Sequence, residues 1–281
     1  MVAANVPRPP NSPDSCNLSG LFLLEGIIVA KGAKADIRPK LVRLLGIVMF
    51  LSLWQVLSIV QNTPSIVRID KIATATLSEI QSGTIANNLV STMWILARGI
   101  FIASIIGIAV SVLVCYEQLL YDLIMPTMEF CRNIPSITLF PILLVIYGIG
   151  DASRIFVIFW TAFPPVLLSA VQGIQNVDKG SIEAAMALGF SNRQIMRHIK
   201  LPLASPSIIN GIRIGAGSGF VAVVVAEMLG ATKGLGYMVL WTTNSFKYPE
   251  TYVYILLIGL LGALTNLWME KVKCRYERKV S

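Results

Sequence analysis

Six apolar stretches, each long enough to cross a lipid bilayer, limit what this chain can fold into. They cover approximately residues 44–60, 88–114, 121–147, 155–171, 206–229 and 251–269. A helix of about 20 apolar residues spans the hydrocarbon core of a bilayer. A soluble domain has more charged residues than this chain, which is 55% hydrophobic and only 14% charged. The sequence therefore predicts an all-α membrane protein with about six transmembrane helices.

The distribution of basic residues predicts the orientation of these helices. With the N-terminus in the cytoplasm, segments 1–43, 115–120, 172–205 and 270–281 hold 15 Lys and Arg residues, against 5 in 61–87, 148–154 and 230–250. Because loops rich in Lys and Arg stay in the cytoplasm, both termini are expected there. The net charge of +8 then reflects membrane topology, and we expect no nucleic-acid partner.

The same reading divides the chain into three parts. Residues 1–43 form a cytoplasmic tail, disordered at first, in which the short apolar segment 21–30 can lie on the membrane surface. Residues 44–269 form the transmembrane domain. Residues 270–281 form a basic cytoplasmic tail.

Sequence motifs of enzymes are missing from the chain. There is no GxxxxGK[ST] phosphate loop, no HExxH or GxSxG motif, and no metal-binding spacing of His and Cys. The acidic Glu227, near the outer end of a span, is expected to be structural. We predict no catalytic residue, no metal site and no cofactor in this chain.

Glycines at four-residue spacing mark one face of the fifth span. Gly211, Gly215 and Gly219 lie on that face, where they let another helix approach closely. A similar ridge of small residues, Gly99, Ala103 and Gly107, lies on the second span. Such faces pack helices within one subunit, or they form a subunit interface or line a pore.

Charged residues within the spans are candidates for a transport pathway, because a charge in a bilayer needs a partner or water. Glu129 and Arg132 are three residues apart and can neutralise each other on a helix. Pro126 and Pro135 bracket this pair and are expected to loosen the backbone. Arg98 and Arg213 have no local partner. These arginines either pair with other helices and the membrane surface, or attract an anionic solute.

Residues 183–202 interrupt the apolar pattern with the sequence EAAMALGFSNRQIMRHIKLP. Asp178 or Ser181 can cap a first helix, and Gly189 suits a bend with positive φ. Ser191 and Gln194 fit a capping box that begins a second helix. That helix has an apolar side and a basic side, and Pro202 is expected to end it. Physical reasoning leaves two roles open: a rigid element that transmits force, or a helix resting on the membrane surface.

A resemblance decides between these two roles. The residues Glu183, Ala184, Ala185, Gly189, Ile199, Leu201 and Pro202 match the EAA loop of the permease subunits of ABC importers. The surrounding stretches RNIP from Arg132, YGIG from Tyr147, VVAE from Val224 and GLGY from Gly234 resemble the subgroup that imports nitrate, aliphatic sulfonates, taurine or bicarbonate.

The resemblance implies a type I importer fold in a bacterial inner membrane. It also implies a second permease subunit, expected to be an identical copy, and an extracytoplasmic solute-binding protein. Two cytoplasmic ATPase subunits would bind ATP and magnesium and receive the EAA loop in a groove. Small residues such as Ala184 and Ala185 are expected to seat against that groove. Remaining alternatives are a vitamin or pyrimidine precursor as solute, or a secondary transporter that works without an ATPase.

Overall fold

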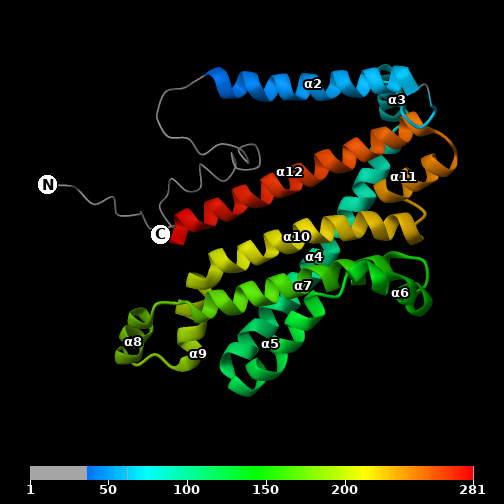
Figure 1. Ribbon diagram of the computed structural model, residues 1–281. Helices are drawn as coiled ribbons and strands as arrows, with labels where there is room; N and C mark the ends of the chain where they lie inside the picture. The colour runs from blue at the N-terminus through cyan, green and yellow to red at the C-terminus, as the bar shows by residue number, and fades with distance from the viewer. Residues whose placement is uncertain (1–36, 62, 281) are drawn as a thin grey trace.

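The protein is described by a computed structural model, which covers residues 37–61 and 63–280 (Figure 1). Every regular element within these ranges is helical. Four helices are long and apolar enough to cross a membrane: α4 (Thr84–Tyr116), α7 (Asp151–Gln175), α10 (Leu201–Gly230) and α12 (Tyr248–Val280). The prediction of an all-α membrane protein is confirmed. The apolar segment expected at 21–30 lies outside the described residues.

Helix α7 occupies the centre of the bundle. It packs against α4 on one side and α10 on the other, and α10 packs in turn against α12 (Figure 1). Residues of α7 on both sides, including Val157, Ile158 and Ala162, are completely buried. Buried on these two sides, α7 forms the core of the bundle.

The glycines at four-residue spacing on α10 all meet α7. A Cβ added at Gly211 would lie 2.7 Å from the Ser169 side chain. A Cβ added at Gly215 would lie 3.1 Å from the Ala162 side chain, and one added at Gly219 would lie 3.3 Å from the Ile158 side chain. On α4, Gly99 makes the same kind of approach to Ile158. The small-residue faces therefore pack helices within one subunit, which was one of the interpretations left open by the sequence.

The span expected at 121–147 is not one continuous helix but two parts separated by a break. Helix α5 (Gln118–Arg132) ends at Asn133, and a 3-10 turn, η1 (Ser136–Leu139), leads into α6 (Phe140–Tyr147). The two parts meet at an angle of 89°. Pro135 supplies the physical reason, because proline cannot donate a backbone hydrogen bond and disfavours helical backbone in the residue before it.

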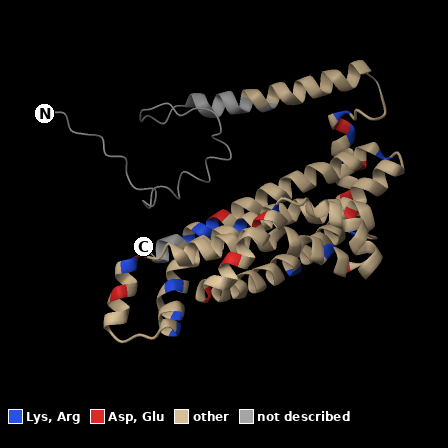
Figure 2. Ribbon diagram, turned by 60° about the horizontal axis from the view of Figure 1, so that its bottom comes forward, with Lys and Arg blue, Asp and Glu red and all other residues tan. Residues whose placement is uncertain are grey.

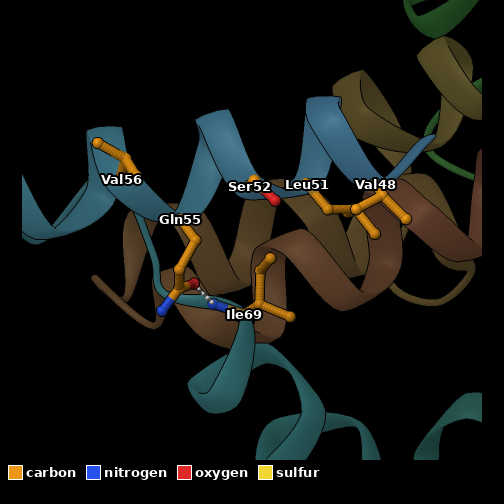
Figure 3. Close-up of a pocket in the computed structure, with 6 residues that line it drawn as sticks. All are labelled: Val48, Leu51, Ser52, Gln55, Val56 and Ile69. Carbon is orange, nitrogen blue, oxygen red and sulfur yellow. Dashed lines mark hydrogen bonds between the residues drawn. The ribbon is translucent and has the colours of Figure 1, made fainter. Parts of the chain in front are cut away.

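Two further helices frame the bundle near the first expected span. Helix α2 (Ile37–Gln61) contains the span expected at 44–60, although its apolar part, Val48–Gln61, is shorter than the other spans. Helix α3 (Ile69–Gln81) follows and contacts α12. A shallow apolar pocket lies between α2 and the start of α3, where Oε1 of Gln55 accepts a hydrogen bond from the Ile69 N–H at 3.1 Å (Figure 3). Gln55 thereby holds the two helices together.

A buried polar network fixes the short helix α11 (Leu235–Asn244) to α4 and α10. The Glu227 side chain on α10 is fully buried. Its carboxylate accepts hydrogen bonds from the Thr92 hydroxyl at 2.8 Å and from the Gly236 N–H at 3.0 Å. The Thr92 oxygen accepts in turn from the Leu235 N–H at 2.9 Å. Glu227 thus caps the start of α11 from a neighbouring helix, in agreement with its expected structural role.

Candidate functional site

The EAA segment forms a helix, a bend and a second helix, as the sequence predicts. Helix α8 (Lys179–Ala187) begins at Asp178, whose side chain accepts a hydrogen bond from the Ser181 N–H at 2.9 Å. Gly189 follows the helix with a φ of +81°, a value that residues with a Cβ rarely adopt. The chain therefore turns at Gly189 without the strain that another residue would bring.

A capping box starts the second helix. The Ser191 side chain accepts from the Gln194 N–H, and the Gln194 side chain accepts from the Ser191 N–H at 2.8 Å. Helix α9 (Asn192–Ile195) continues through a π turn, η2 (Met196–Lys200), directly into α10. Because these residues lie close together in the sequence, their capping interactions could be predicted from sequence alone.

Pro202 does not end this second helix, contrary to expectation. Residues 192–230 form one continuous helical stretch of 39 residues, with Pro202 in the first turn of α10. Proline is tolerated where the helical hydrogen-bond pattern is already interrupted, and the wider π turn immediately before it provides such an interruption. The EAA loop is thus joined rigidly to a membrane span.

Apolar residues anchor the loop to the bundle. Ile195 and Met196 are buried, with 2% and 4% of their surface exposed. Met196 packs in one cluster with residues of α7 and α10, namely Ala170, Ile174, Ala204 and Ile208. Leu201 packs against the same cluster, and Ile199 is half-buried. The second helix therefore has the predicted apolar side, and that side faces the bundle.

Ala184 and Ala185 have different surroundings, although the sequence suggested one role for both. Ala184 and Glu183 are exposed, whereas Ala185 is 4% exposed. The carbonyl of Ala185 accepts a hydrogen bond from the Phe190 N–H at 3.1 Å. Ala185 therefore packs inside the loop and does not present its side chain to a partner. The expectation for Ala185 was wrong, because even a helix as short as α8 buries one of its faces against the rest of the loop.

The outer surface of the loop is apolar at its tip and basic at its sides. Met186, Leu188 and Phe190 are 53%, 78% and 39% exposed. Arg193 and Arg197 are exposed nearby. The loop with its basic residues extends beyond the ends of the membrane helices in Figure 2. Three large apolar side chains exposed together on such a projection are typical of a binding surface.

Arg98 pairs with a residue of another helix, which is one of the alternatives left open by the sequence. Its Nη1 lies 3.5 Å from Oδ2 of Asp151, and its guanidinium carbon lies 4.8 Å from the centre of the Trp94 ring. Asp151 also accepts from Nη2 of Arg154 at 2.6 Å. Arg154, counted as a loop residue in the sequence, is only 3% exposed and donates to the carbonyls of Gly150 and Lys233. Asp151 thus stands between two arginines.

Glu129, Arg132 and Pro135 lie together at the break between α5 and η1, and all three are exposed. No ion pair joins Glu129 to Arg132 in the part of the chain that the structure describes, so the expected mutual neutralisation was wrong. The Asn133 amide instead donates to the Glu129 carbonyl at 2.9 Å, which satisfies the backbone where the helix ends. Arg132 thus remains an exposed cation at the interrupted span.

Arg213 lies near the middle of α10 and is half-buried. Its Nε is buried without a hydrogen-bond partner in the structure. The three arginines are therefore not brought together: Arg98 lies on α4 beside the first residue of α7, Arg132 lies at the break, and Arg213 lies on α10.

Thr92, Asp151 and Arg154 were not identified from the sequence. Thr92 forms a hydrogen bond with Glu227, which lies 135 positions away in the sequence. A single threonine in an apolar helix does not indicate which residue its partner is. Asp151 and Arg154 are three residues apart, a spacing that allows an ion pair on a helix and could have been noticed.

Comparison with a family model places these elements in a known context. Residues 99–279 match the model of the binding-protein-dependent transport system inner membrane component. This chain belongs to that family. It is therefore a permease subunit of an ABC importer, a membrane protein that works with ATPase and binding-protein partners. The match includes α7, the EAA loop and α10.

Individual relatives agree with this assignment. A protein of Methanocaldococcus jannaschii named as an ABC transporter permease is 30% identical over 230 residues, which are 80% of this permease and 86% of the relative. The taurine transport system permease protein TauC of Escherichia coli K12 is 30% identical over 68% of this permease and 70% of its own length. The nitrate import permease protein NrtB of Synechocystis is 32% identical over 60% and 62%.

Solved structures show the same fold. A chain of the MetNI methionine ABC transporter, in an inward-facing conformation, superimposes with a TM-score of 0.58 at 22% identity. The superposition covers 69% of this permease and 96% of the MetNI chain. The expected type I importer fold is confirmed. Helices α2 and α3 precede residues 99–279, which match the family model.

Proposed function

We propose that this permease forms the pathway for a small anionic solute and is coupled to ATPase subunits through its EAA loop. In this proposal α8 and α9 seat in a groove of a separate ATPase subunit, which binds ATP and magnesium. A binding protein delivers the solute at the opposite end, and a second, identical permease subunit completes the pathway. Both termini lie in the cytoplasm of a cell with this importer in its inner membrane.

The observation that carries this proposal is the exposed apolar tip of an otherwise rigid loop. Met186, Leu188 and Phe190 are exposed, while Met196 on the same loop is anchored in the bundle. A helix resting on the membrane surface would direct its apolar side at lipid. Here the apolar side of α9 faces the bundle, and the loop that carries the second apolar surface projects away from the membrane helices (Figure 1). This arrangement favours a protein partner.

The continuity of the loop with α10 supports a mechanical role. Residues 192–230 form one helical stretch, so a displacement of α9 by a partner is transmitted to a membrane span. The π turn within this stretch is a place where the helix can adjust. Coupling in this sense requires no catalytic residue in the permease itself.

The proposal of an anionic solute rests on Arg132 and on the relatives. Arg132 is exposed where the span between α5 and α6 is broken, and broken helices line solute sites in many transporters. The names of the relatives refer to taurine, nitrate and aliphatic sulfonates, all of which carry an anionic group. Purifying the binding protein and measuring which solute it binds identifies the solute class.

Two substitutions test the coupling proposal in the complete transporter. Gly189→Val opposes a φ of +81°, which costs about 1–3 kcal/mol, and Ala184→Trp enlarges the exposed face of α8. We expect both variants to reach the membrane but to lose the ATPase subunits, or to hydrolyse ATP without solute stimulation. Co-purification and ATPase assays in reconstituted vesicles measure these effects.

Each substitution has a matched control. Gly189→Asn keeps a residue that tolerates positive φ, so it should retain coupling better than Gly189→Val. Thr232→Trp adds the same large side chain at an exposed position in the turn before α11, at the opposite end of the bundle. Normal transport and ATPase retention in both Gly189→Val and Ala184→Trp would show that the loop has no coupling role.

A further inference from the structure

On the neighbouring helices α10 and α12, two residues of opposite charge each have one buried side-chain atom without a hydrogen-bond partner. Nε of Arg213 on α10 and Oε2 of Glu270 on α12 are both buried without a partner. The Glu270 side chain belongs to a residue that is only 7% exposed. Burying a charged group without a partner is unfavourable, so such groups in a native protein need an explanation. No ion pair joins these two residues in the part of the chain described.

The register of the two helices places Arg213 and Glu270 at the same depth. Helices α10 and α12 run antiparallel and lie side by side (Figure 1). Phe220 of α10 meets Gly262 of α12, where an added Cβ would lie 3.1 Å from the ring. Arg213 precedes Phe220 by two helical turns, and Glu270 follows Gly262 by slightly more than two. At 1.5 Å per residue, both lie about 10–12 Å from this contact, toward the EAA-loop end.

The faces of the helices also correspond. Residues seven apart lie on nearly the same helix face, so Arg213 shares the face of Phe220 that meets α12. Met269 shares the face of Gly262 in the same way and is 8% exposed. Glu270 is the next residue, about 100° further around the helix. Because the Arg213 and Glu270 side chains are both long, a shift of α10 along α12 can bring the guanidinium and the carboxylate together despite this offset.

The connections of α10 provide a source for such a movement. Helix α10 continues from α9 through the π turn, whereas α12 is not connected to the EAA loop. A displacement of α9 by an ATPase subunit thus moves α10 relative to α12. Shifts of 1–2 Å between packed helices are common in switching proteins. Arg213 is the only Lys or Arg of α10 in its range of 201–230, so no other cation on this helix can neutralise Glu270.

We propose that Arg213 and Glu270 form an ion pair when ATP-bound ATPase subunits displace α9. The present structure shows the state in which the two side chains are separated. The closed pair holds α10 against α12 in one conformation of the transport cycle. In this proposal Arg213 is a positioning residue that acts through Glu270 and does not contact the solute. The inference rests on the proposed coupling role of the EAA loop.

Charge exchange in the complete transporter tests the pair. We expect Arg213→Glu and Glu270→Arg each to lower the solute uptake rate at least tenfold, because each leaves two like charges facing each other at a buried position. The double variant should recover uptake to within about threefold of the wild type, since it restores the pair in reverse. Glu270→Arg combined with Lys71→Glu is the control and should show no recovery, because Lys71 is exposed on α3.

Neutral variants keep the test valid if the reversed charges prevent folding. Arg213→Gln and Glu270→Gln remove the charges with little change in volume. For an ion pair, the double neutral variant should transport no worse than the poorer single variant. Independent, multiplying losses in the two neutral variants, or no rescue by charge exchange between folded proteins, would overturn the inference.

Cross-linking measures the movement directly. In a variant without native cysteines, Arg213→Cys and Glu270→Cys should form a disulfide faster in the ATP–vanadate-trapped transporter than without nucleotide. Equal rates in both states would contradict a nucleotide-dependent approach. This result is separable from the coupling proposal, which fails if Ala184→Trp and Gly189→Val leave transport and ATPase retention intact.

Discussion

Arg98, Arg132 and Arg213 carry the same charge in or beside apolar helices, but their surroundings assign them different roles. Arg98 pairs with Asp151, which it shares with Arg154, and lies over the Trp94 ring. Arg213 has a buried Nε without a partner. Arg132 is exposed at the broken span and has no ion-pair partner among the described residues. An arginine that is neither paired nor buried retains the strongest attraction for an anion in an aqueous pathway.

We therefore predict that Arg132 contributes more to solute uptake than Arg98. Arg132→Gln should lower the uptake rate about tenfold or more, because loss of an unpaired charge weakens attraction of the anion along its route. Arg98→Gln should have a smaller effect, since Asp151 already offsets its charge. Initial rates of solute uptake at several concentrations, with ATPase retention as the assembly control, measure both variants. Normal uptake by Arg132→Gln, or a larger loss in Arg98→Gln, would assign Arg132 a structural role only.

At the scale of helices, features that depend on interactions within a few residues could be predicted from the sequence. Features that depend on contacts between distant segments could not. Asp178, Gly189 and the pair Ser191 and Gln194 shape the EAA loop through bonds within a few residues, so the sequence predicts them. The bend of 89° after α5 depends on how α6 packs against α7. Pro135 therefore indicated where the helix breaks, but it could not indicate the angle between the two parts.

The position of α11 illustrates the same limit. Helix α11 begins where Glu227 and Thr92 meet, and these two residues are 135 positions apart. A polar residue in an apolar helix indicates that a partner exists without indicating which one. In the same way, the length of an apolar stretch predicts a membrane span. Only tertiary packing decides whether the helix within that span is continuous or broken.

Helix packing between α7 and α10 leads to a prediction about Gly211. An added methyl group would lie 2.7 Å from Cβ of Ser169 and 2.9 Å from the backbone oxygen of Pro165. Since backbone cannot move aside easily, Gly211→Ala should destabilise the permease by about 1–3 kcal/mol. The thermal unfolding midpoint of the detergent-solubilised protein measures this loss.

Gly217 on the same helix is the matched control. An added Cβ at Gly217 meets nothing within 4 Å. Gly217→Ala should leave the midpoint unchanged or raise it, because alanine favours helix over glycine by up to about 1 kcal/mol. Equal midpoints for the two variants would show that α7 and α10 can separate without cost, contrary to the close packing seen here.

At the scale of the whole molecule, the permease has two distinct ends. The EAA loop and the C-terminal end of α12 lie at one end, and the turns before α7 and α11 lie at the other (Figure 1). At this second end the Arg154 side chain donates to the Lys233 carbonyl at 3.4 Å, which ties the two turns together. The basic residues of the EAA loop and of the last turns of α12 gather at the first end (Figure 2).

The two ends should lie on opposite sides of the membrane, with the EAA loop in the cytoplasm. The reason is the bias of 15 basic residues to 5 between the two sets of loops, since basic segments are retained in the cytoplasm. In a variant without native cysteines, a membrane-impermeant thiol reagent added to intact cells should label Ala152→Cys and Lys233→Cys. It should not label Arg193→Cys or Lys271→Cys until the cells are permeabilised. All four positions are exposed in the structure, so accessibility depends on the side of the membrane. Labelling of Arg193→Cys in intact cells would place the EAA loop outside, where no ATPase could reach it, and would exclude both the orientation and the coupling role.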